Sequence, residues 1–230
     1  MTGASRGLGH ALTAELVRQG WHVVADARNG ARLESAVRDL SGPGTITAIA
    51  GDVTDVTHRH RLADATSRHG GLDLLVNNAS VLGPSPQPRL ADYPLGVLAE
   101  VYATNTIAPL GLIQLLLPLL ERRSGAIVNV TSDAAVEPYI GWGGYGSSKA
   151  ALDQITNILG AEHPHLRVYS LDPGDMNTDL HQRAFPDEDI SDRADPASVV
   201  PALLQLANRD LPSGGYRAAD LIAGTELVST

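Results

Sequence analysis

Thr2-Gly3-Ala4-Ser5-Arg6-Gly7-Leu8-Gly9 leads directly into an amphipathic helix predicted over Leu8–Arg18, where leucines recur at positions 8, 12 and 16. Glycines in such a turn let the backbone bend tightly and approach a pyrophosphate, which the helix N-terminus then stabilises. The spacing of glycines 3, 7 and 9 departs from the common dinucleotide fingerprint. By itself the stretch therefore fits an ordinary strand-to-helix turn as well as a nucleotide site.

Outward from this turn, short apolar runs alternate with longer helical stretches. The runs are apolar on both faces and predict buried strands over Trp21–Ala25, Thr45–Ile49, Leu72–Val76, Ala126–Thr131 and Leu166–Leu171. The intervening stretches predict helices over Arg32–Leu40, Thr57–Arg68, Leu95–Arg122, Tyr145–Glu162 and Pro196–Asn208. Strands separated by helices form a parallel sheet with right-handed crossovers. We expect one doubly wound, Rossmann-like α/β domain over residues 1–230, with Leu82–Gly96 and Asp179–Asp195 as its longest irregular segments.

Composition excludes several classes of function. The 230 residues carry a formal charge of -9, which disfavours nucleic acid as a partner. There is no cysteine, so disulfides and thiolate metal sites are impossible, and the cytoplasm is the expected compartment. The apolar stretch Leu110–Leu120 is too short to span a bilayer, and no membrane partner is expected. The pairs His58/His60 and His163/His165 are interpreted as solvated, and no metal is expected.

Tyr145 and Lys149 form a second motif at the start of a predicted helix, and Ser132 lies upstream at the end of a predicted strand. A phenol acts as an acid or base near neutrality only if a nearby cation favours the phenolate. Lys149 lies one helical turn from Tyr145, on the same face, and is expected to supply that charge. Ser132 is placed to hold a carbonyl oxygen while Tyr145 protonates it. A tyrosine beside a solvated lysine is the alternative for this pair taken alone.

Taken together, these motifs resemble the short-chain dehydrogenase/reductase superfamily over almost the whole chain. The resemblance also rests on motifs that occur in the family's order: Asp52-Val53, Asn77-Asn78-Ala79, Asn105, the 13-residue interval between Ser132 and Tyr145, and Asp172-Pro173-Gly174 followed by Thr178.

The resemblance implies the roles of individual residues. The catalytic tetrad would be Asn105, Ser132, Tyr145 and Lys149, with Asn105 holding a water that links Lys149 to solvent. Asp52 and Val53 would contact adenine, and Asn78 and Ala79 the adjacent ribose region. The remaining expected cofactor contacts are Gly3, Ser5, Arg6, Gly7, Leu8, Gly9, Arg28, Pro173, Gly174, Met176 and Thr178, together with Tyr145 and Lys149.

Three departures from the family pattern stand out. Ser80 replaces the usual glycine after Asn-Asn-Ala, and Asp172 replaces the usual asparagine before Pro-Gly. Only Met1 and Thr2 precede Gly3, whereas the family has a central strand of about five or six apolar residues there. We expect either that residues upstream of Met1 complete this first strand or that the sheet is compromised, because buried unpaired backbone groups cost about 1–3 kcal/mol each.

The residues at the end of the family's second strand help to decide between NAD(H) and NADP(H). In the family, an acidic side chain there selects NAD(H), whereas a following basic residue pairs with the phosphate of NADP(H). Ala27 occupies the acidic position and Arg28 the basic one, with Arg6 as a second cation, so NADP(H) is favoured. A register shift of one residue would point Asp26 at the ribose and make NAD(H) the cofactor.

The expected function is hydride transfer between nicotinamide and a small carbonyl or alcohol substrate. Asp133–Trp142, Leu82–Gly96 and Asp179–Asp195 are expected to bound the substrate pocket, whose mixture of acidic and apolar residues favours a neutral ketone, aldehyde or secondary alcohol. The alternative is a catalytically silent protein that uses the fold to bind or sense a nucleotide. The apolar helices Leu95–Arg122 and Tyr145–Glu162 predict a homodimer or homotetramer.

Overall fold

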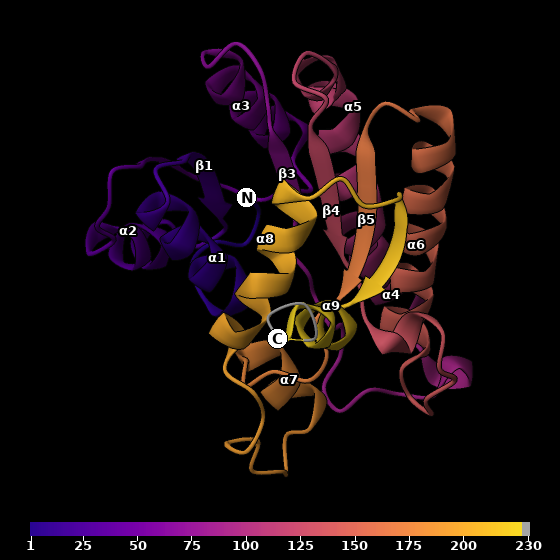
Figure 1. Ribbon diagram of the computed structural model, residues 1–230. Helices are drawn as coiled ribbons and strands as arrows, with labels where there is room; N and C mark the ends of the chain where they lie inside the picture. The colour runs from indigo at the N-terminus through magenta and orange to yellow at the C-terminus, as the bar shows by residue number, and fades with distance from the viewer. Residues whose placement is uncertain (227–230) are drawn as a thin grey trace.

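A computed structural model describes residues 1–226 as two neighbouring parallel sheets, one of two strands and one of four, covered by helices (Figure 1). The strands are β1 (His22–Ala27), β2 (Thr45–Ala50), β3 (Leu74–Asn77), β4 (Ala126–Val130), β5 (Arg167–Asp172) and β6 (Gly214–Arg217). β1 pairs with β2, and β3, β4, β5 and β6 pair in that order, every pair being parallel. The doubly wound α/β class predicted from the alternating pattern is confirmed.

Most helices follow the predicted stretches closely, and two in the C-terminal part of the chain were not predicted. They are α1 (Gly7–Arg18), α2 (Gly30–Arg38), α3 (Val56–Ser67), α4 (Leu95–Tyr102), α5 (Ala108–Glu121), α6 (Gly143–Glu162), α7 (Asp179–Ala184), α8 (Val200–Asn208) and α9 (Ala218–Glu226). Short 3-10 turns cover Leu90–Asp92, Asp133–Ala135 and Pro196–Val199. The segment Asp179–Asp195, expected to be irregular, begins with α7, because Thr178 caps that helix by accepting a hydrogen bond from the amide of His181.

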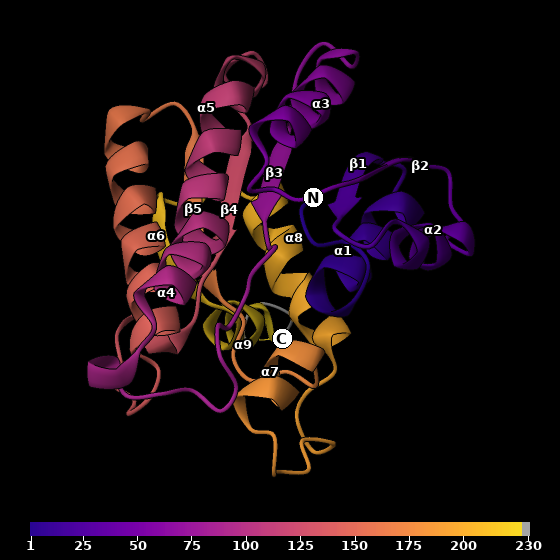
Figure 2. The same ribbon diagram turned by 180° about the vertical axis from the view of Figure 1, so that it is seen from behind.

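Two apolar clusters hold helices against opposite faces of the sheet. Leu12 of α1 and Leu203 of α8 pack with Val128 on one face. Leu62 of α3 and Leu116 of α5 pack with Ile127 on the other. α8 accordingly lies in front of the sheet in Figure 1, and α5 lies in front in Figure 2. Alternation along β4, which is buried at every residue, thus supplies both cores.

The long apolar helix belongs to the second core. A π turn over Ala103–Ile107 joins α4 to α5, so that the helix runs without a break from Leu95 to Glu121. These 27 residues are long and apolar enough to cross a membrane, and half of their most apolar window is buried inside the protein. The helix is therefore longer than the stretch Leu110–Leu120, and its burial against α3 and β3 identifies it as a core helix.

The first four residues connect the two groups of strands. The N-terminus lies between β1 and β3 (Figure 1). The amide of Asp26 donates to Met1 O (3.1 Å), the amide of Ala4 donates to Asp26 O (2.8 Å), and the amide of Thr2 donates to Val76 O (3.1 Å). Met1–Ala4 thus bridge the two sheets in extended conformation, through bonds to the middle and carboxyl end of β1 and to the carboxyl end of β3.

Candidate active site

The glycine turn needs glycine for two different reasons. Gly3 and Gly7 have φ values of 71° and 53°, in the left-handed region that favours glycine. At Gly9 a Cβ atom would lie 2.4 Å from Gly3 O, so only glycine lets α1 pack this close to the turn. The side chain of Asn78 donates to Thr2 O (2.9 Å) and fixes the turn to the end of β3. The α1 N-terminus therefore opens onto the pocket behind a turn held close to the end of β3, which suits an anion.

Asp26 is buried beneath this turn and does not face the pocket as a free carboxylate. Its Oδ1 accepts from the amide of Gly3 (3.0 Å), and its Oδ2 lies 2.9 Å from Nε2 of His58. Arg61 Nη2 lies 2.9 Å from His58 Nδ1, and a guanidinium can only donate, so His58 accepts at Nδ1 and donates to Asp26 from Nε2. The solvated interpretation of His58 is therefore wrong: the ring is buried because it satisfies a buried carboxylate.

The other histidine pair lies at the far end of α5 and α6. Glu121 Oε1 is 3.6 Å from His163 Nδ1 and 3.7 Å from His165 Nε2. His165 and Glu121 are about half exposed, in agreement with a largely solvated cluster remote from the pocket.

Ser132, Tyr145 and Lys149 converge at the carboxyl end of β4. Lys149, only 2% exposed, donates from Nζ to Val130 O (2.7 Å) and lies 5.5 Å from the centre of the Tyr145 ring. Ser132 follows β4 directly, and its hydroxyl donates to Asp133 Oδ1 (3.0 Å). The helical spacing of Tyr145 and Lys149 in α6 thus brings an ammonium beneath a phenol, as the four-residue interval predicts.

The pKa of Tyr145 is raised, whereas the sequence led us to expect that Lys149 would favour the phenolate. Burial, together with the carboxylates of Asp172 and Asp133, raises the pKa of Tyr145 to about 12, while hydrogen bonds with Ser80 and Ser132 oppose the rise. Burial lowers the pKa of Lys149 to about 8, against the attraction of Asp153. Desolvation is the largest of these influences on Tyr145, so the phenol is protonated at neutral pH.

Asn105 lies in the π turn between α4 and α5, fully buried. Its Oδ1 accepts from the amide of Val81 (2.9 Å) and from Ser80 Oγ (3.1 Å), and its Nδ2 donates to Val81 O (2.9 Å) and Ser148 Oγ (3.0 Å). All four side-chain positions are thereby engaged within the protein. The side chain ties the loop after β3 to α6, and its expected role in holding a water remains a prediction.

Ser80 is a site residue that motif reasoning treated only as a tolerated departure. Its hydroxyl joins Asn105 to the phenol of Tyr145, so a glycine there would remove both interactions. The sequence held a signal for this role, since a serine hydroxyl in place of the family's usual glycine adds a hydrogen-bonding group near the expected catalytic residues.

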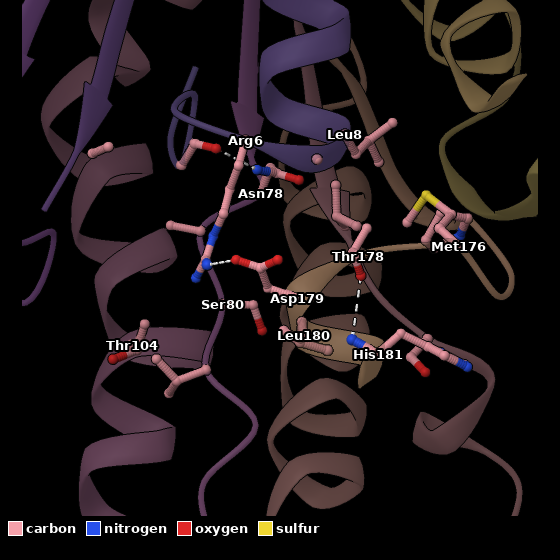
Figure 3. Close-up of a pocket in the computed structure, with 18 of the residues that line it drawn as sticks. Arg6, Leu8, Asn78, Ser80, Thr104, Met176, Thr178, Asp179, Leu180 and His181 are labelled. Carbon is pink, nitrogen blue, oxygen red and sulfur yellow. Dashed lines mark hydrogen bonds and ion pairs between the residues drawn. The ribbon is translucent and has the colours of Figure 1, made fainter. Parts of the chain in front are cut away.

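A pocket of about 380 Å³ runs from the glycine turn to Tyr145. Every expected cofactor or catalytic residue contributes to its lining except Gly9 and Asn105, which lie behind it. Lining residues that the motifs did not single out include Arg32, Thr104, Asp179, Leu180 and His181 (Figure 3). Arg32 had a signal, because it follows Arg28 by four residues and lies in the first turn of α2.

One side of the pocket is closed by α7. Asp179 forms an ion pair with Arg6 of the glycine turn (Figure 3), and its Oδ2 lies 3.6 Å from Nη1 of Arg32. Trp142 packs edge-on against Tyr145, with ring centres 5.8 Å apart, and also lies 5.8 Å from Phe185 after α7. These aromatic rings and Leu180 form an apolar wall beside the phenol.

Leu82–Gly96 is not the pocket wall that we expected, since none of its residues belongs to the lining. Leu82 is buried behind Tyr145, and Gly83 O accepts from Nη2 of Arg183 in α7 (3.0 Å). Within Asp133–Trp142, only Asp133 and Trp142 line the pocket, while Val136 and Ile140 are exposed. The loop supports the wall from outside, because Leu82 packs behind Tyr145.

Comparison with known proteins places this site in a family. The model of the short chain dehydrogenase family matches residues 1–189. The chain belongs to that family. Serine 3-dehydrogenase from Rhizobium radiobacter is 34% identical over 184 residues, covering 78% of this chain and 72% of that protein. The (S)-benzoin-forming benzil reductase of Saccharomyces cerevisiae is 30% identical over 214 residues, covering 89% and 79%.

Solved structures give the same assignment. A short chain dehydrogenase from Pseudomonas syringae superposes with a TM-score of 0.89 at 28% identity, covering 94% of this chain and 92% of that one. A short chain dehydrogenase from Shigella flexneri, complexed with NADP, has a TM-score of 0.84 at 26% identity and covers 95% of each chain. This short-chain dehydrogenase is therefore an oxidoreductase of a family that uses nicotinamide cofactors and acts on small molecules.

Proposed function

We propose that this short-chain dehydrogenase interconverts a neutral carbonyl compound and its alcohol, with NADP(H) as the preferred cofactor and Tyr145 as the general acid and base. The observation that carries the proposal is the buried Tyr145 phenol, held between hydroxyls of Ser80 and Ser132 above the ammonium of Lys149. A nucleotide-binding module without catalysis has no need of a lysine that is 2% exposed beside a buried phenol.

The residues present fit a dinucleotide. The glycine turn is a cradle that a Cβ would fill, and the N-terminus of α1 opens onto the pocket. The nicotinamide, when bound, supplies or accepts the hydride. Tyr145 donates the proton to the carbonyl oxygen in reduction and recovers it in oxidation. Ser132 orients that oxygen, and Lys149 stabilises the phenolate that forms.

The preference for NADP(H) rests on three arginines. Arg6, Arg28 and Arg32 all line the pocket; a phosphate on the adenosine ribose would meet Arg28 directly and would compete with Asp179 for Arg6 and Arg32. Ala27 offers no acceptor to an unmodified ribose diol. Asp26, the residue that would favour NAD(H), has both carboxylate oxygens bonded to Gly3 and His58.

The substrate pocket favours a neutral molecule with an apolar side. Trp142 and Leu180 offer apolar surface, while Asp133 places a carboxylate next to Ser132. Arg183 is bonded to Gly83 O, and Arg193 to Asp192 (2.9 Å), so neither is free to bind an anionic substrate. A carboxylate or phosphate substrate would meet repulsion without a matching cation.

A panel of carbonyl compounds tests the proposal. NADPH consumption is measured with neutral apolar ketones, hydroxyketones, keto acids and phosphorylated ketones at equal concentration, each repeated with NADH. We expect the highest kcat/KM for a neutral ketone with NADPH. Faster turnover of keto acids or phosphates would contradict the substrate class. Tight cofactor binding without turnover of any carbonyl or alcohol would support the silent nucleotide-binding alternative.

We also propose a homodimer or homotetramer built on α5 and α6, in the cytoplasm. Leu112, Leu116 and Leu152 turned out to be core residues, whereas Ile107 and Ile158 are 58% and 45% exposed. These exposed side chains lie on the helices that a two-fold axis would pair. Light scattering at micromolar concentration that gives a monomer mass would contradict the assembly.

A further inference from the structure

Two histidines and a glutamate meet at the end of the molecule opposite the pocket. Glu121 is the last residue of α5, and His163 and His165 lie in the turn that joins α6 to β5. Both helices end at the top of Figure 1, whereas α7, which closes the pocket, lies at the bottom. None of the three residues lines the pocket. We call Glu121, His163 and His165 the histidine cluster.

The turn that carries both histidines is closed by a hydrogen bond and anchored in the core. The amide of Leu166 donates to His163 O (2.9 Å), and Pro164 occupies the second position of the turn, where its fixed φ is favoured. Leu166 is 3% exposed and packs in the same apolar cluster as Leu120, the residue before Glu121. The backbone segments that carry the three side chains are therefore fixed to one core before any ligand binds.

The polar atoms of the histidine cluster are spaced for a shared cation. Glu121 Oε1 lies 3.6 Å from His163 Nδ1 and 3.7 Å from His165 Nε2, and all three atoms lie within 4.8 Å of one another. A hydrogen bond between nitrogen and oxygen is shorter, at about 2.7–3.2 Å. Ligand atoms bound at about 2.0–2.1 Å to a tetrahedral Zn²⁺ lie about 3.3–3.4 Å apart. Small rotations of these side chains would close the remaining difference.

The electrostatics of the histidine cluster favour a cation. Glu121 and His163 stand at the C-termini of α5 and α6, where the helix dipoles are negative. Within residues 1–226, Glu121 forms ion pairs with the two histidines and with no arginine or lysine. A carboxylate at a helix C-terminus is unfavourable unless a positive charge neutralises it. A divalent cation would supply that charge, and neutral imidazoles would bind it through their ring nitrogens.

The chemistry of the donor atoms selects the ion. Two imidazole nitrogens and one carboxylate oxygen suit Zn²⁺, whereas Mg²⁺ and Ca²⁺ prefer sites made of oxygen atoms. The side chains of Glu121 and His165 are 43% and 53% exposed, so a water molecule can reach the cluster as a fourth ligand. No metal is expected from the sequence, because Glu121 lies on a separate helix and joins the histidines only in the fold.

We infer that the histidine cluster is a zinc site that clamps the end of α5 to the turn before β5. His163 Nδ1, His165 Nε2 and Glu121 Oε1 are the three protein ligands, and water is the fourth. The ion stabilises the folded chain, because a ligand that binds only the folded state raises its melting temperature. The site is separate from the proposed reaction, since it lies at the opposite end of the sheet from Tyr145.

Zinc binding to the untagged protein tests the inference, because a polyhistidine tag would itself bind the ion. After metals are removed with a chelator, equilibrium dialysis measures bound Zn²⁺ in the wild type, in Glu121→Gln and in His165→Gln. We expect one zinc ion per chain in the wild type and an affinity at least about 10-fold weaker in each variant. His60→Gln is the matched control, because it removes an exposed histidine of α3, and it should bind zinc like the wild type.

Thermal melting and NMR spectra add two independent measurements. A hundredfold excess of Zn²⁺ over its Kd should raise the melting temperature of the wild type by about 5–10 °C, whereas Glu121→Gln should gain much less. The ion should also shift the ring signals of His163 and His165 and leave those of His60 in place. A wild type that binds no zinc, or variants that bind it as tightly as the wild type, would overturn the inference. Equal stabilisation by Ca²⁺ would contradict imidazole ligation.

Discussion

The two ends of the gap between β1 and β3 differ sharply in how their polar groups are satisfied. At the carboxyl end, Thr2, Gly3 and Asn78 are bonded across the gap, and Asp26 lies beneath them with both oxygens engaged. At the amino end, the same two strands face a cavity of about 700 Å³. The pocket of about 380 Å³ opens at the carboxyl end of the gap, which we call the bonded end. The comparison shows that the pocket is organised locally, by four residues of central strand and a buried carboxylate.

Removing the buried ammonium of Lys149 should have the largest effect on the rate of catalysis. Lys149→Ala removes the charge that stabilises the phenolate, and kcat is expected to fall about 10²- to 10⁴-fold. Wild-type reduction should also slow as the pH rises through about 8, where the ammonium loses its proton. Steady-state rates between pH 6 and 10 measure both effects. A flat profile in the wild type, or a variant that keeps its activity, would contradict the role of Lys149.

His58→Ala tests whether the bonded end also stabilises the fold. The substitution leaves the buried Asp26 carboxylate with one partner fewer, and we expect a loss of about 2–3 kcal/mol, or about 5–10 °C in melting temperature. His60→Ala is the matched control, because that histidine is exposed on the same helix. Calorimetry that finds equal losses in the two variants would show that the pair between His58 and Asp26 contributes little.

Arg28→Ala tests the cofactor preference at the outer edge of the pocket. Loss of a charged hydrogen bond to a ribose phosphate should raise the Kd for NADPH about 10- to 100-fold and leave the Kd for NADH unchanged. Arg38→Ala, on the exposed outer part of α2, should change neither constant. Fluorescence titrations of both cofactors provide the measurement. Tighter binding of NADH than NADPH by the wild type would mean that the expected strand register is wrong.

Ser80→Gly should give the smallest effect, confined to one direction of the reaction. The hydroxyl lowers the pKa of Tyr145, so its removal raises that pKa further and disfavours the phenolate that alcohol oxidation requires. We expect oxidation to slow by a few fold with its pH optimum shifted upward, while reduction, which needs the protonated phenol, changes little. Equal slowing in both directions would point to a general disturbance through Asn105.

The sequence predicted what local periodicity and motif order control. The early strands and helices, the fold class and the lining of the cofactor pocket follow from apolar spacing and from the order of Gly3, Asn78, Ser132 and Tyr145. β6 was missed because its Gly-Gly-Tyr-Arg sequence has no apolar alternation. The partner of Asp26 was missed because His58 lies 32 residues away and meets it only in the folded sheet. The raised pKa of Tyr145 depends on burial, which spacing does not report.

Tyr145→Phe tests the central claim most directly, with Tyr93→Phe as its control. Tyr93 is also buried, lies outside the pocket lining, and its hydroxyl has no hydrogen-bond partner among the described residues. The Kd for NADPH and the kcat for the best neutral ketone are measured in both variants. We predict that Tyr145→Phe binds NADPH within about threefold of the wild type but loses about 10²- to 10⁴-fold in kcat, while Tyr93→Phe keeps both values. Near-wild-type turnover in Tyr145→Phe would contradict the account.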